Sequence, residues 1–269
     1  MTEAFVISDA SHLAFNKSEL VNEINDWDWN EFLDLCLKYS KDINSDGKND
    51  IWLTDWNEYD ILEYLAKCYI TQGCKDSDGF KKLLIKLKDT SEKGGLVKDD
   101  HIDTSNCILH NATLSLSNEE LATKNKDERE YYLLPTINKK EPIYLIDGMM
   151  YCVNRFSKNP EVAQELLVDM MSPEYVIPVC GSTWYANQEW YNSYYSQYLR
   201  QNPNAQDART NGMLLEVTPK LYDSFEKAYT HGTISKVRNA GEQYIMLLKS
   251  YLQEDIDEEA FINGLSEYR

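Results

Sequence analysis

Oxygen-bearing side chains recur at alternate positions in an acidic segment, at the spacing of a calcium-binding loop. They are Asp42, Asn44, Asp46 and Asp50. Gly47 stands where such a loop must turn, and the backbone carbonyl of Lys48 would complete the oxygens around a hard cation. The twelfth position, which should supply a two-oxygen carboxylate ligand, is Leu53. The segment predicts either calcium held by fewer protein oxygens or a turn whose Asx side chains cap their own backbone.

The charge balance bears on which partners the chain can have. Its 269 residues include 45 acids and 27 bases, a net charge of −18, with no basic stripe. This composition argues against nucleic acid and against an anionic membrane surface as partners. Aromatic residues with a polar tip are abundant, with 19 Tyr and 6 Trp against 7 Phe. Such side chains suit interfaces and sugar-stacking clefts, although packing in the core is the equally plain alternative for any one Trp.

Catalytic and redox motifs are missing from the sequence. The six cysteines form no CxxC pair, and the four histidines are scattered. We find no nucleophile-elbow serine and no phosphate-binding glycine loop. The amino-terminal residues lack the basic and apolar regions of a signal peptide, and no apolar run reaches transmembrane length. The sequence therefore favours a protein that is not an enzyme.

Hydrophobic periodicity predicts alternating strands and helices, and hence an α/β fold. Strands are expected at 13–16, 51–53, 131–135, 143–146 and 151–154. Helices are expected after Asp28, around 61–69, around 80–87, from Pro160 and over the last third of the chain. Asp28 and Glu31 form a capping-box pattern, and Asp257 is the expected cap of the last helix. The helix from Pro160 is expected to bury Ala163, Leu166, Leu167 and Met170.

Three segments, in this order, resemble the substrate-binding proteins of carbohydrate ABC importers, of the maltose-binding type. The first runs from Phe15-Asn16-Lys17 through Asp26-Trp27-Asp28-Trp29 into the acidic loop. The second runs from Leu134-Pro135-Thr136 to the Ser157-Lys158-Asn159-Pro160 stretch. The third is Tyr251-Leu252 with Asp255-Ile256-Asp257-Glu258-Glu259-Ala260. Each is short, but together they cover nearly the whole chain in register.

The resemblance implies a periplasmic-binding-protein-like fold of type II that lacks most of its amino-terminal lobe. Residues 1–138 and 177–269 would form the carboxy-terminal lobe, and 139–176 would return to the other lobe. The chain would be truncated, or its missing half would lie on another chain. The family binds an oligosaccharide without chemistry, by hinge closure, and delivers it to membrane permease subunits. Its members are extracellular, membrane-anchored or periplasmic.

The resemblance also implies where a sugar would bind. The matching cleft positions are Thr54, Asp55, Trp56, Asn57, His110, Asn111 and Ser235, with Asp147 and Trp184 as further candidates. We expect Trp56 to stack on a sugar ring and Asp55 or Asn57 to bind its hydroxyls. The segment around His110 departs from the family pattern. Two other functions stay open: a calcium-stabilised interaction module, and a glycan hydrolase that uses paired carboxylates.

Overall fold

The computed structural model describes residues 2–8, 10–98, 103–114, 131–137, 144–146, 153–170, 232–234 and 241–268. The fold is α/β, as predicted. The chain divides into two compact units, the larger of which comprises 2–112, 130–146 and 224–269. The smaller unit is made mainly of 113–129 and 147–223. The lobe boundaries expected from the resemblance remain a prediction.

A mixed four-stranded sheet lies at the centre of the larger unit, with strands in the order β2-β3-β1-β4. The strands are β1 (Thr2–Ile7), β2 (Trp52–Thr54), β3 (Cys107–Leu114) and β4 (Tyr131–Leu133). β2 and β3 run parallel, whereas β1 and β4 run antiparallel. Next to β1, β5 (Tyr144–Ile146) and β6 (Gly232–Ile234) form a separate parallel pair. Because β2 and β3 are parallel and β2 ends at Thr54, the carboxyl end of β2 lies beside the middle of β3.

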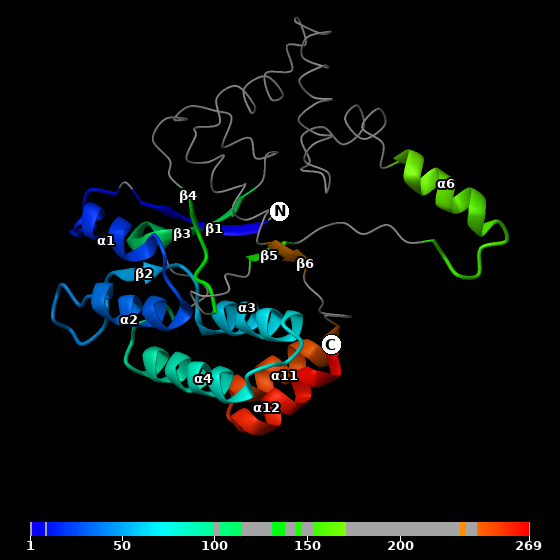
Figure 1. Cartoon of the computed structure of the whole chain (residues 1–269). Helices are drawn as coiled ribbons and strands as arrows, with labels where there is room; N and C mark the ends of the chain where they lie inside the picture. Colours follow the sequence, from blue (N-terminus) through cyan, green and yellow to red (C-terminus); the bar gives the residue numbers. More distant parts are fainter. Residues whose placement is uncertain are drawn as a thin grey trace, which may run out of the picture. The chain divides into compact units, whose positions relative to one another are not determined.

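Helices cover the sheet in successive layers (Figure 1). α2 (Trp29–Tyr39) and α3 (Glu58–Thr71) lie directly below it, and α1 (Lys17–Ile24) lies to one side. α4 (Ser77–Glu92), α11 (Glu242–Leu252) and α12 (Glu258–Leu265) lie below α2 and α3. Two short 3-10 helices span Thr104–Asn106 and Ser266–Tyr268. Buried side chains from all these layers form one contiguous core, which joins the two ends of the chain.

Local capping explains where several helices begin. The Asp28 side chain accepts hydrogen bonds from the Asn30 and Glu31 backbone N–H groups, and the Glu31 side chain accepts one from Asp28 N–H. This is the predicted capping box. Asp257 caps α12 as predicted, through a 2.8 Å hydrogen bond from Ala260 N–H. The apolar positions that helical spacing predicts to face inward are buried: Trp29, Phe32, Leu33 and Cys36 in α2, Ile61, Leu65, Cys68 and Tyr69 in α3, and Phe80, Leu83, Leu84 and Leu87 in α4.

The structure differs from the predicted elements at 13–16, where a strand was expected, and at 232–234, where a helix was expected. Residues 13–16 form a turn and an extended lead into α1, because the Asn16 side chain accepts a hydrogen bond from Glu19 N–H and so caps the helix. β1 lies earlier, at Thr2–Ile7. In the last third, which was expected to be helical, Gly232–Ile234 forms β6 and pairs with β5. Of the strand expected at 151–154, the structure describes Val153 and Asn154, and neither is in a strand.

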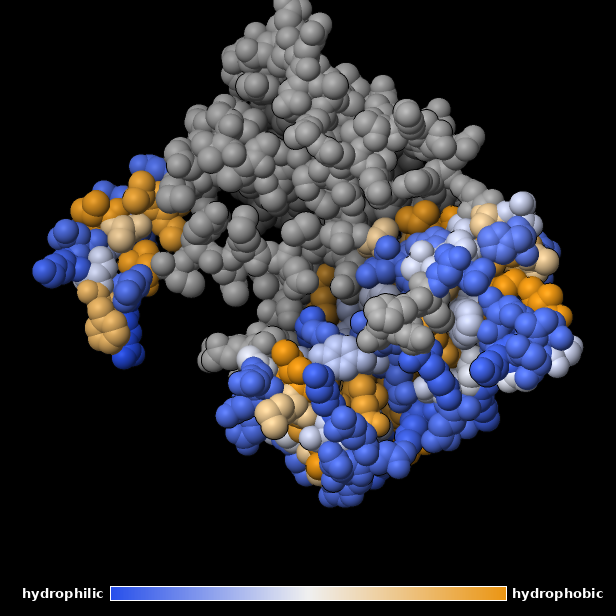
Figure 2. Space-filling view, turned by 180° about the vertical axis from the view of Figure 1, so that it is seen from behind, coloured by the Kyte–Doolittle hydropathy of each residue, from blue (hydrophilic) through white to orange (hydrophobic). Residues whose placement is uncertain are grey.

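α6 (Pro160–Met170) is the described helix of the smaller unit, and it begins at Pro160 as predicted. Its expected inward face is not covered. Leu166 is 58% exposed, and Ala163 and Leu167 are half-buried. Val162 and Val168 are exposed too, and Figure 2 shows hydrophobic and hydrophilic surface side by side on this helix. The prediction that Leu166 is buried is therefore wrong for this structure.

Candidate functional site

The carboxyl end of β2 lies beside the middle of β3 and brings together side chains that are far apart in the sequence. Thr54 is the register partner of Leu109, and the pairing continues with a 3.3 Å hydrogen bond from Asp55 N–H to the Leu109 carbonyl. Asp55 therefore leaves β2 where His110 and Asn111 continue β3. The carboxyl edge of parallel strands is where open α/β sheets bind ligands. We call Asp55, His110 and Asn111 the β2/β3 edge site.

Hydrogen bonding fixes the Asp55 carboxylate in this site. Both of its oxygens accept from the backbone N–H of Asn111, at 3.0 and 3.1 Å. Nδ1 of His110 lies 3.8 Å from Oδ2 of Asp55, too far for a hydrogen bond. The Asp55 and His110 side chains are 17% and 30% exposed. The site thus presents a positioned carboxylate and an imidazole to solvent.

The thiol of Cys107, near the β2/β3 edge site, does not support nucleophilic catalysis there. Cys107 is buried in β3 two residues before Leu109, and burial, with the carboxylates of Asp55 and Asp103, raises its pKa to about 12. The nucleophilic form of cysteine is the thiolate. At neutral pH Cys107 is therefore a protonated core residue. The groups that reach solvent at this edge can bind hydroxyl and amino groups through hydrogen bonds and charge.

Two predicted ligand residues beside Asp55 have local structural roles. Thr54 is 1% exposed, and its Oγ1 accepts a 3.1 Å hydrogen bond from Trp56 N–H. The Asn57 side chain caps α3 by accepting from Asp60 N–H, and the Asp60 carboxylate accepts in return from Asn57 N–H. These bonds hold the turn between β2 and α3. The prediction that Asn57 is a polar partner for a ligand finds no support in this geometry.

The predicted stacking role of Trp56 is wrong in this structure. Trp56 is 5% exposed and packs among aromatic rings of the core. Its ring centroid lies 5.5 Å from that of Phe5, 6.2 Å from that of Trp29 and 5.7 Å from that of Tyr64. A stacking platform needs one open face, and Trp56 has none. The apolar body of tryptophan is used here to join the sheet to α2 and α3.

The acidic loop has the arrangement of the second alternative, a turn stabilised by its own side chains. Asp42 accepts hydrogen bonds from the N–H groups of Ser45, Asp46 and Gly47. Further side-chain oxygens that accept from loop N–H groups belong to Asn44, Asp46 and Asp50. Within the part of the chain that the structure describes, no three His, Cys, Asp or Glu side chains are grouped closely enough to hold a metal ion. Calcium at this loop remains a prediction.

Replacing Asp42 with alanine should lower the free energy of unfolding by about 1–2 kcal/mol, since a cap residue with several backbone partners is lost. Chemical denaturation with and without calcium measures this effect. Lys48→Ala is the matched control in the same loop, because it leaves the Asx side chains in place and should change stability by less than about 0.5 kcal/mol. A rise in melting temperature with calcium that Asp46→Ala abolishes would establish the metal site instead.

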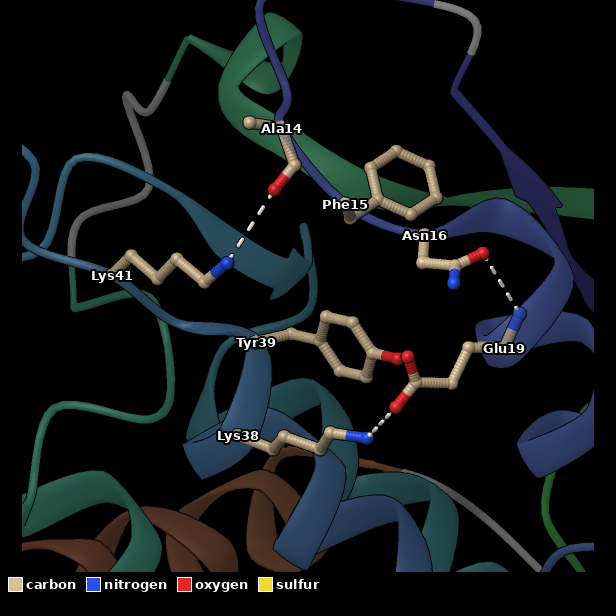
Figure 3. Close-up of a pocket in the computed structure, with 7 residues that line it drawn as sticks. All are labelled: Ala14, Phe15, Asn16, Glu19, Lys38, Tyr39 and Lys41. Atoms are coloured by element: carbon tan, nitrogen blue, oxygen red, sulfur yellow. Dashed lines mark hydrogen bonds and ion pairs between the residues drawn. The ribbon is translucent and has the colours of Figure 1, made fainter.

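A pocket of about 480 Å³ lies between α1 and the end of α2, and the sequence did not single it out (Figure 3). Its lining residues are Ala14, Phe15, Asn16, Glu19, Lys38, Tyr39 and Lys41. Lys38 Nζ pairs with Glu19 and Glu23, each at 2.7 Å, and the Tyr39 hydroxyl donates to Glu23 at 2.8 Å. Burial and this hydrogen bond raise the pKa of Tyr39 to about 12. Because the polar groups of Lys38 and Tyr39 already bond to Glu23, this pocket is a weaker candidate for ligand binding than the β2/β3 edge site.

The remaining predicted site residues, Asp147, Trp184 and Ser235, lie outside the described residues. In the chain, Asp147 follows the last residue of β5 and Ser235 follows the last residue of β6.

Comparisons with protein-family models, with curated proteins and with solved structures find no match to this chain. The resemblance to importer substrate-binding proteins therefore rests on the short sequence segments alone. Among the described helices, none combines the length and the apolar character that crossing a membrane requires.

Proposed function

We propose that the β2/β3 edge site binds an oligosaccharide reversibly, and that the chain is the solute-binding component of an ABC importer. The observation that favours a site here is the hydrogen bonding between Asp55 and Asn111, 56 positions apart, where the carboxyl end of β2 lies beside β3. A fixed carboxylate and an imidazole near it offer the acceptors and donors that sugar hydroxyls need.

The wider assignment rests on the resemblance. It includes the periplasmic-binding-protein-like fold, delivery to permease subunits and an extracellular, periplasmic or membrane-anchored location. A hydrolase would need two carboxylates placed across a glycosidic bond, and the predicted residues that meet at this edge include only one. The calcium-stabilised module stays the alternative, because the carboxylates of the acidic loop that accept backbone hydrogen bonds keep further acceptor positions. Binding without chemistry is the function that this site supports best.

Calorimetric titration of the full chain against a panel of neutral and charged oligosaccharides tests the proposal. We expect a saturable response for at least one sugar, and we expect Asp55→Ala to weaken it about tenfold or more, because a charged hydrogen-bond partner is removed. Lys41→Ala, at the pocket of Figure 3, is the control and should leave the affinity unchanged. The opposite pattern would place the binding site in that pocket, and no response to any sugar would overturn the proposal.

A further inference from the structure

The surroundings of Asp55 bear on which class of carbohydrate the β2/β3 edge site takes. Its carboxylate accepts from a single described donor, the Asn111 N–H, which both oxygens share. No lysine or arginine of the described segments forms an ion pair with it, and the His110 imidazole lies 3.8 Å away. A carboxylate offers about four acceptor positions. Asp55 therefore has acceptor capacity beyond the Asn111 contact, at a side chain that still reaches solvent.

A ligand that covers this carboxylate removes water from it. A neutral sugar supplies hydroxyl donors but no counter-charge, so part of the cost of desolvating the charge is not compensated. A protonated amine supplies both a donor and the opposite charge, and charge-assisted hydrogen bonds are about twice as strong as neutral ones. A uronic acid adds a second negative charge beside Asp55, in a chain whose net charge is −18. Charge complementarity thus ranks amino sugars first and acidic sugars last.

We propose that Asp55 makes the β2/β3 edge site selective for carbohydrates that carry a protonated amino group, over their neutral counterparts. This inference rests on the proposed function and deepens it, because it assigns the charge class of the ligand to one side chain. The amino group binds at Asp55, and His110 and Asn111 border it.

Pairs of monosaccharides that differ only at C2 test the selectivity: glucosamine with glucose, galactosamine with galactose, and mannosamine with mannose. The full chain is titrated with each sugar while the amide resonance of Asn111 is followed, at a pH where the amine is protonated. This amide is a direct reporter, because it donates to Asp55. We expect the amino member of at least one pair to bind about tenfold more tightly than its neutral partner.

Two variants separate local recognition from the overall negative charge. Asp55→Asn keeps an acceptor for the Asn111 N–H but removes the charge, and it should bring the ratio of the two affinities close to one. Asp255→Asn, on the exposed turn between α11 and α12, removes one charge elsewhere and should leave the ratio unchanged. Equal affinities in the unaltered chain, or a preference that survives Asp55→Asn, would overturn this inference alone. If no sugar of the pairs binds but an oligosaccharide of the calorimetric panel does, only the selectivity fails; if neither set binds, the proposed function fails as well.

Discussion

Replacing Trp56 with alanine should destabilise the larger unit by about 3–5 kcal/mol, the range for removing a buried aromatic side chain. The loss is large because Trp56 contacts Phe5 of β1, Trp29 of α2 and Tyr64 of α3, so one cavity weakens three elements. Urea denaturation followed by far-ultraviolet circular dichroism measures it. Trp56→Phe keeps part of the ring volume and should lower the free energy of unfolding clearly less than Trp56→Ala.

Trp52→Ala is the matched control for this prediction. Trp52 lies on β2, the strand just before Trp56, and is only half-buried, so its removal should lower the free energy of unfolding less than that of Trp56. The stacking role would be restored by one specific result: Trp56→Ala unfolds at the same urea concentration as the unaltered chain and yet loses sugar binding.

The position of Trp56 shows why its role could not be predicted from the sequence. A Trp directly after a short strand, beside Asp55 and Asn57, fits a sugar-binding loop and a buried strand end equally well. What decides between them is the set of rings from distant segments, above all Phe5 in β1. The sequence did not predict that strand. Without β1, the space into which Trp56 packs could not be foreseen.

Features that depend on neighbouring residues were predicted well. The capping box of α2 is an example, because Asp28 and Glu31 satisfy each other's backbone within one helical turn. Buried faces of α2, α3 and α4 follow from the same helical spacing. The pairing of β5 with β6 joins Tyr144 to Gly232, and no local pattern in Gly232–Ile234 indicates that partner. The predictions were weakest where such distant pairing decides the structure.

The candidate site depends on the family resemblance for its residues and on distant strand pairing for its geometry. Asp55, His110 and Asn111 were all candidates through the family resemblance, Asp55 in the loop after the aromatic strand and the other two at a segment that departs from the family pattern. The parallel pairing of β2 and β3 brings these residues to one edge. The pocket around Tyr39 was missed, although Phe15 and Asn16 were already among the residues that carry the resemblance. A sequence motif at the start of a helix did not by itself indicate a cavity beside that helix.

Replacing Phe261 with alanine should also lower the free energy of unfolding by about 3–5 kcal/mol. Phe261 is fully buried in α12 and stacks on Tyr251 of α11, with ring centroids 4.6 Å apart. α12 packs against α4, and α11 packs against α3, so the end of the chain shares one core with Trp56. The same urea experiment measures the change. Met246→Ala is the control: Met246 is 61% exposed on α11, and its loss should cost less than about 0.5 kcal/mol.

The Phe261 variant also tests whether the larger unit unfolds as one cooperative structure. Trp27, Trp29 and Trp56 lie in an aromatic cluster with Phe5 of β1 and Phe32 of α2, whereas Phe261 stacks on Tyr251. If the core is continuous, Phe261→Ala will shift the tryptophan fluorescence transition by the same amount as the helical signal, because a two-state unit loses all its structure together. A fluorescence transition that stays in place while the helical signal moves would show that α11 and α12 unfold separately. The β2/β3 edge site would then need only the sheet, α2 and α3 for its support.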